Sequence, residues 1–97
     1  MYAWTITKDH LADLPYGLHS MRDDAGTVGP SDATMDHDAI VAHAEGKKFR
    51  MFDDDGELNY EGVLVGGDGF EPLDDFGMPN AGATEIKYLE DGEWVTL

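Results

Sequence analysis

Carboxylates are the side chains of this sequence best able to do chemistry, and ten of them lie between Arg50 and Lys87 with no basic residue among them. Carboxylates can ligate hard cations, transfer protons as general acids and bases, or present a charged surface to a basic partner. The spacing of the ten decides which role fits. They are Asp53, Asp54, Asp55, Glu57, Glu61, Asp68, Glu71, Asp74, Asp75 and Glu85.

A calcium-binding loop of the EF-hand type is the first role to test. Such a loop needs acidic ligands at positions 1, 3 and 5, glycine at position 6 and glutamate at position 12. With Gly56 at position 6, position 1 is Met51 and position 12 is Gly62. Neither Met51 nor Gly62 can supply the carboxylate that its position requires, so the pattern of a calcium loop is not met. The aspartate run before Gly56 instead predicts a tight turn. Weak binding of a hard cation by the other aspartates stays open.

The histidines and serines complete no zinc-binding or hydrolytic pattern. His37 and His43 are six residues apart, whereas two helical ligands share a face at a spacing of three or four. Neither Ser20 nor Ser31 lies in the Gly-x-Ser-x-Gly turn that exposes a nucleophile. We therefore expect no catalytic residue, no metal site and no cofactor, and we expect the chain not to be an enzyme.

Length and composition predict one small globular domain spanning residues 1–97. Hydrophobic residues make up 41% of the chain, which is enough for one modest core. No apolar run approaches the roughly 20 residues of a membrane span, and the N-terminal residues lack the pattern of a signal peptide. Since there is also no cysteine to form disulfides, we expect a cytoplasmic protein.

The net charge of −15 limits the class of partner. Residues 51–97 hold 13 acidic side chains and one basic side chain. A field of this sign repels nucleic acid and anionic membranes and attracts basic surfaces. We therefore expect a basic protein surface as partner, and neither direct nucleic-acid binding nor membrane binding. An acid-rich surface is also a general solubility device, and this alternative stays open.

The first half of the chain predicts one strand and one helix. Alternation of aromatic or aliphatic residues with threonine predicts a strand over Tyr2–Lys8. Residues 9–30 fit neither period and predict a long loop, with one helical turn near His10–Leu14. An amphipathic stripe preceded by candidate N-caps predicts a helix from about Met35 to Glu45, with Gly46 as the C-terminal glycine.

A hairpin is the clearest local structure in the second half. Alternation predicts strands over Lys48–Phe52 and Glu57–Val65, joined by the turn at residues 53–56. In the second strand the alternation directs Asn59 outward, together with its acidic neighbours. Gly62 indicates a bulge or bend in that strand.

Residues 66–83 predict a second long loop, and two strands over Thr84–Leu89 and Trp94–Leu97 follow it, joined at Asp91-Gly92. The order is thus strand, helix, then four strands in two hairpins. This order predicts an α+β fold with one antiparallel sheet of about five strands and a single helix packed against it.

Three segments resemble a family of small, uncharacterised acidic proteins of bacteria and phages. They are Trp4–Leu11, Phe49–Gly62 and Phe70–Gly82, and the resemblance extends over most of the chain. It implies an accessory role on a mobile element and transfers no functional residue, because the family has no assigned activity. In size and charge the chain is also similar to phage inhibitors of CRISPR and restriction enzymes that act as DNA mimics.

Together these observations predict a non-enzymatic acidic protein that blocks a basic, nucleic-acid-binding surface of a partner, such as a host defence complex. We expect the ten carboxylates to form one continuous patch, with Glu57, Glu61 and Glu85 projecting from one sheet face. A housekeeping domain of an acidic proteome, with no electrostatic partner, is the alternative. Weak binding of a metal or small ligand is a third reading, and the sequence predicts no oligomeric state.

Overall fold

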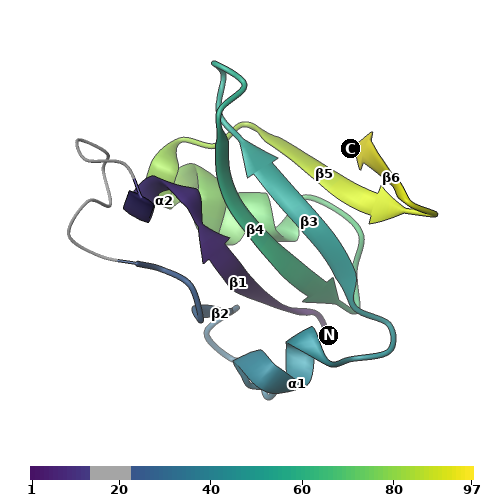
Figure 1. Cartoon of the computed structure of the whole chain (residues 1–97). Coiled ribbons are helices and arrows are strands. Elements are labelled where there is room, and N and C mark those ends of the chain that lie inside the picture. Colours follow the sequence, from purple (N-terminus) through teal and green to yellow (C-terminus); the bar gives the residue numbers. More distant parts are fainter. Residues whose placement is uncertain (14–22) are drawn as a thin grey trace.

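The computed structural model describes residues 1–13 and 23–97 (Figure 1). The predicted α+β class is confirmed, with one antiparallel sheet and short helices. In chain order the elements are β1 (Ala3–Asp9), the 3-10 turn η1 (His10–Asp13), β2 (Val28–Gly29), α1 (His37–Val41), β3 (Lys47–Phe52), β4 (Leu58–Val65), the π-helical turn η2 (Leu73–Gly77), α2 (Met78–Ala81), β5 (Glu85–Glu90) and β6 (Glu93–Thr96).

The sheet has six strands in the order β2-β1-β4-β3-β5-β6, and every neighbouring pair is antiparallel. The sequence predicts about five, and the additional strand is β2, which lies inside the segment predicted to be a loop. Its pairing is short, since Val28 lies opposite Thr5 and Gly29 lies opposite Trp4. Two residues are too few to show the period-two alternation that identifies a strand.

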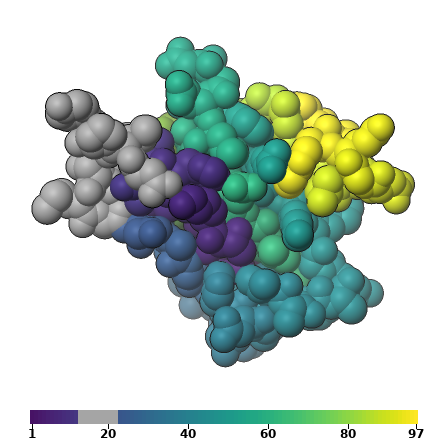
Figure 2. Space-filling view, in the orientation of Figure 1, coloured from purple at the N-terminus to yellow at the C-terminus, as the bar shows by residue number. Residues whose placement is uncertain are grey.

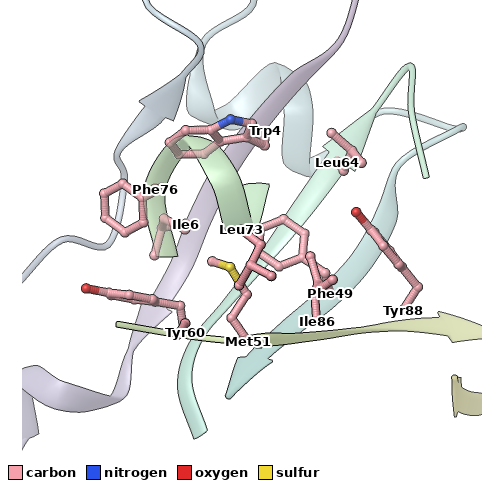
Figure 3. Close-up of a cluster of buried hydrophobic side chains, with 11 residues drawn as sticks. Trp4, Ile6, Phe49, Met51, Tyr60, Leu64, Leu73, Phe76, Ile86 and Tyr88 are labelled. Carbon is pink, nitrogen blue, oxygen red and sulfur yellow. The ribbon is translucent and has the colours of Figure 1, made fainter. Parts of the chain in front are cut away.

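One face of the sheet is covered by η2 and α2, which lie behind the strands in Figure 1. Phe76 of η2 packs against the rings of Trp4 and Tyr60, with centroids 5.4 and 4.9 Å away. Figure 3 shows this core, to which β1, β3, β4 and β5 contribute alternate residues. The buried cluster comprises Trp4, Ile6, Phe49, Met51, Tyr60, Leu64, Leu73, Phe76, Ala83, Ile86 and Tyr88.

The opposite face is covered only at one end, by α1. Ile40 of this helix is fully buried in a small cluster with Ala3, Val63 and Val65. A contact of 2.6 Å between Oγ1 of Thr5 and Nδ1 of His37 also holds the helix to β1. No helix of residues 1–13 and 23–97 lies over the rest of this face, across the middle of β3, β4 and β5 (Figure 1).

Both predicted hairpins are present. The β3–β4 turn closes with the N–H of Gly56 donating to the carbonyl of Asp53, and Gly56 has a positive φ of 78°. The β5–β6 turn uses Asp91 and Gly92, both with positive φ, as expected for a two-residue connection. The strand boundaries differ from the predicted ones by at most one residue.

Two details of β4 correct the sequence prediction. Asn59 was expected to point outward, but it is buried, because Met51 pairs with Tyr60 and Phe52 with Leu58, so Asn59 is the extra residue of a bulge. The irregularity expected at Gly62 instead lies in β1, where the register shifts between Ile6 and Lys8.

Two helical segments also differ from the prediction. The helix predicted over Met35–Glu45 is limited to His37–Val41, with Asp36 as N-cap, and consecutive turns carry the chain on to Gly46. The segment predicted as a loop, residues 66–83, contains η2 and α2. Its two prolines and several glycines interrupt the apolar spacing from which a helix is predicted, so these short helical turns were not expected.

Candidate functional site

Four of the ten carboxylates lie on the β3–β4 turn, which projects beyond the end of the sheet at the top of Figure 1. We call residues 53–57 the acidic tip. Asp54, Asp55 and Glu57 are exposed. Among residues 1–13 and 23–97, no lysine, arginine or histidine forms an ion pair with the tip. Its negative charges are therefore available to a partner.

Asp53 gives the acidic tip its rigidity. Its Oδ1 atom accepts hydrogen bonds from the backbone N–H groups of Asp55 and Glu57, each at 3.0 Å, and its Oδ2 atom accepts one from Nδ2 of Asn59 at 3.3 Å. Partial burial acts to raise the pKa of Asp53, but these three hydrogen bonds outweigh it and lower the pKa. Asp53 therefore acts mainly as a turn brace, and its three neighbours form the accessible charge.

A fifth carboxylate lies at the base of the tip. Glu85 begins β5 and pairs in register with Phe52, the last residue before the tip. Its Oε1 atom accepts a hydrogen bond of 3.3 Å from Thr96. The neighbouring Thr84 donates to Oδ1 of Asp54 at 2.8 Å, which ties the tip to the start of β5.

Glu61 does not belong to an acidic surface. One of its oxygens lies 2.7 Å from Nε2 of His10, and the other accepts a hydrogen bond of 3.0 Å from Nε of Arg50. Burial acts to raise the pKa of Glu61, but the hydrogen bonds and charges of these two partners lower it overall. The charge of Glu61 is used within the fold, contrary to the expectation that it projects toward a partner.

Asp68 and Glu71 lie at the other end of β4 from the tip. Asp68 is 3.9 Å from Nζ of Lys47, and Oε1 of Glu71 accepts the N–H of Gly69 at 2.9 Å. Burial raises the pKa of Tyr88 well above its ordinary value, and the charges of Glu71 and Asp68 raise it further. Glu71 thus holds the turn after β4, whereas exposed Asp68 makes only a long ion pair.

Asp75 is also engaged within the fold. Its Oδ2 atom accepts hydrogen bonds from the Tyr2 hydroxyl at 2.6 Å and from Nε1 of Trp4 at 3.0 Å. The hydrogen bond to Asp75, together with burial and the nearby charges of Asp75, Glu71 and Asp32, raises the pKa of Tyr2 to about 12. Asp74, next to it on η2, is exposed.

The expectation of one continuous acidic patch is therefore wrong. The eight residues of β4 separate the acidic tip from Asp68 by roughly 24 Å, given the rise of an extended strand. Asp75 lies on the η2 side of the sheet, and Glu61 lies on the opposite face. The structure brings together Asp53, Asp54, Asp55, Glu57 and Glu85 at one end, and it places Asp68, Glu71, Asp74 and Asp75 away from them around Tyr2, Tyr88 and η2, with Glu61 apart from both groups.

The sequence reasoning missed a second surface, on the uncovered sheet face. A groove of about 390 Å³ lies there, with Lys48 and Arg50 on one side and Val41, Leu89 and Trp94 around it. The guanidinium of Arg50 lies 4.1 Å from the centre of the Trp94 ring. The signal was the alternation of Lys48 and Arg50 with buried Phe49 and Met51, which directs both cations to the same face.

In the part of the chain that the structure describes, no three histidine or acidic side chains are placed to hold a metal ion. Ser20 lies outside the described residues. No helix of the described segments is long and apolar enough to cross a membrane.

Comparisons of the chain with protein-family models, with curated proteins and with solved structures gave no match. The resemblance to small acidic proteins of bacteria and phages therefore stays a prediction from the sequence.

Proposed function

We propose that this chain is a non-enzymatic acidic binding protein that occupies a basic, nucleic-acid-binding surface of a partner through its acidic tip. The observation that carries the proposal is the tip itself. It projects from the sheet, it is braced by Asp53, and its Asp54, Asp55 and Glu57 form no ion pair within the described residues. This function places the chain in the cytoplasm with its partner.

A braced turn suits this role because its charges keep fixed positions. Proteins that grip a nucleic acid present rows of lysine and arginine to a closely spaced series of phosphates. Three carboxylates on a narrow projection, with Glu85 at its base, can enter such a row in place of the phosphates. The excess of negative charge on the whole chain adds long-range attraction and speeds association at low salt.

A housekeeping role with no electrostatic partner is the competing function. The observation that favours it is that several acidic side chains already form hydrogen bonds or ion pairs within the fold. Glu61 pairs with His10 and Arg50, Asp75 binds Tyr2 and Trp4, and Glu71 holds its own loop. A protein can retain such residues for its fold alone.

A charge-reversal experiment separates these functions. The tip variant Asp54→Lys/Asp55→Lys/Glu57→Lys keeps the brace at Asp53. The matched control makes the same change in net charge at three exposed acidic residues outside the tip, all without a hydrogen bond or ion pair from their side chains in the described structure. These residues are Asp32, Glu45 and Glu93.

Immobilised wild type and both variants are incubated with a bacterial lysate, and captured proteins are eluted with duplex DNA. We expect wild type and the control to retain DNA-displaceable proteins, and the tip variant to lose them while keeping its circular dichroism spectrum. Rising salt should weaken capture steeply. Equal capture by both variants, or capture that duplex DNA does not displace, would refute the proposed function.

A further inference from the structure

The groove on the uncovered sheet face is the strongest feature of the molecule that the acidic tip does not use. In Figure 2 this face is toward the viewer, with the teal atoms of β3 between the atoms around α1 below and the yellow atoms of β6 at the right. The strands supply a rigid floor through Phe49, Gly62 and Val63. Its volume of about 390 Å³ lies within the range of small-molecule sites, roughly 300–1,000 Å³.

Cationic side chains gather on this face although the chain carries a large acidic excess. Lys48 and Arg50 are two residues apart on β3, so their side chains leave the same face about 7 Å apart. Arg50 is also the cross-strand partner of Lys87. Like charges directly opposite each other in a sheet are destabilising. Glu61, which lies 3.0 Å from Arg50, relieves this repulsion, so Lys48 is the groove cation that remains for an anionic ligand.

Lys48 is the cation most available to such an anion. Lys47, its neighbour in sequence, lies within 4.0 Å of Asp68 and Glu90. Lys48 is exposed, and its side chain forms no ion pair or hydrogen bond within residues 1–13 and 23–97. Arg50 gives its Nε–H to Glu61 and stacks on Trp94, which fixes its orientation at the edge of the groove.

The remaining lining is mixed, since Thr7 and Glu61 are polar or charged and the other side chains are apolar. Trp94 is half-buried, Val41 is 46% exposed, and Leu89 completes the apolar side. A flat apolar group placed against Trp94 and Leu89 would cover surface that water now contacts, which favours binding. The groove thus combines an apolar side with one cation that has no ion pair within the described residues.

We propose that this groove binds a small organic anion, namely a carboxylate, sulfonate or phosphate attached to a flat apolar group. The anion lies between Lys48 and Arg50, and the apolar group lies against Trp94, Leu89 and Val41. The ligand is small because the net charge of −15 repels a polyanion such as nucleic acid. This site is independent of the acidic tip, since no tip residue lines it.

The test is an NMR titration with naphthalene-2-sulfonate, its uncharged sulfonamide and inorganic sulfate. We expect the sulfonate to shift the indole N–H signal of Trp94 saturably. The indole N–H of Trp4, buried and bonded to Asp75, stays unchanged and serves as an internal control. The sulfonamide should bind about fivefold more weakly, as loss of a partly exposed ion pair predicts, and sulfate alone should not shift Trp94.

Two variants locate the site. Lys48→Gln should weaken binding of the sulfonate about fivefold and leave the sulfonamide unaffected. Lys47→Gln changes the net charge equally on the neighbouring residue and should have no effect. The proposal is overturned if the sulfonate does not shift Trp94 in the wild type, if both variants bind it equally well, or if the sulfonamide binds as tightly as the sulfonate.

Discussion

Glu61 and Arg50 face each other across the β3–β4 ladder, with Oε1 of the glutamate 3.0 Å from Nε of the arginine. The second oxygen of Glu61 lies 2.7 Å from Nε2 of His10, which follows β1. One carboxylate therefore links three neighbouring segments of the sheet. This linkage explains why a residue in the most acidic part of the sequence serves stability rather than recognition.

The Glu61 linkage predicts a specific dependence of stability on pH. The pKa of Glu61 is lowered in the fold, so the group stabilises the native state above the ordinary glutamate pKa. That stabilisation is lost as the pH falls through the lowered value. Glu61→Gln should reduce the free energy of unfolding by roughly 1 kcal/mol at pH 7, because the pair is partly exposed, and by less in acid.

Urea denaturation of the wild type and Glu61→Gln at a series of pH values measures this difference. Glu57→Gln is the matched control, because Glu57 is exposed and its side chain has no partner among the described residues. A constant difference between wild type and Glu61→Gln across the acid range would contradict the linkage.

Asp53 and Asp55 should respond differently to the same substitution. Asp53→Ala removes the acceptor of three hydrogen bonds and should cost roughly 1–2 kcal/mol of stability. Asp55→Ala removes only an exposed side chain and should stay within about 0.5 kcal/mol of wild type. Thermal unfolding of both variants measures the contrast. Equal midpoints would mean that Asp53 does not brace the tip.

The Tyr2–Asp75 hydrogen bond predicts behaviour at alkaline pH. The pKa of Tyr2 is raised to about 12, so the folded state keeps a proton that the unfolded state releases earlier. The stabilisation is complete below the ordinary tyrosine pKa and is lost as the pH rises toward 12. Asp75→Asn, which removes the largest cause of the shift, should move the ionisation of Tyr2 to lower pH.

Absorbance of the phenolate at alkaline pH follows this ionisation, and Tyr2→Phe identifies which step of the titration belongs to Tyr2. Asp74→Asn, one residue away on the exposed side of η2, is the control and should leave the step in place. If Asp75→Asn and Asp74→Asn titrate alike, the hydrogen bond does not govern Tyr2.

Local signals in the sequence were sufficient for the two hairpins and the α+β class. The sequences Asp-Asp-Asp-Gly and Asp-Gly predicted the two turns, and the alternation of apolar and polar residues predicted the strands. The short helices of residues 73–81 were missed because their prolines and glycines are typical of loops. The Met35–Glu45 helix was predicted too long because successive turns keep the same spacing of apolar residues as a helix.

The candidate site was predictable only where charges adjacent in sequence stay adjacent in space. This condition holds for the acidic tip, since a tight turn keeps its residues together. It fails for Glu61, whose partners His10 and Arg50 come from two other segments and depend on strand register. It also fails for the groove, because Lys48, Leu89 and Trp94 meet only once β3, β5 and β6 are ordered in the sheet.

The packing at Gly62 gives the last prediction. A Cβ atom at this position would lie 2.2 Å from the carbonyl oxygen of Thr5 and 2.4 Å from Cζ of Phe49. Neither neighbour can move freely, because one is backbone of β1 and the other is a fully buried ring. Alanine in place of glycine normally favours a strand slightly. Overpacking should outweigh this gain, so Gly62→Ala should destabilise the fold by about 2–3 kcal/mol.

Gly56→Ala is the matched comparison for Gly62→Ala. A Cβ at Gly56 meets no atom within 4 Å, so its cost comes from the positive φ alone and should be about 1 kcal/mol. Chemical denaturation of both variants ranks the two costs. If Gly62→Ala is the more stable of the two, β1 and β4 do not approach each other as closely as the register at Gly62 requires.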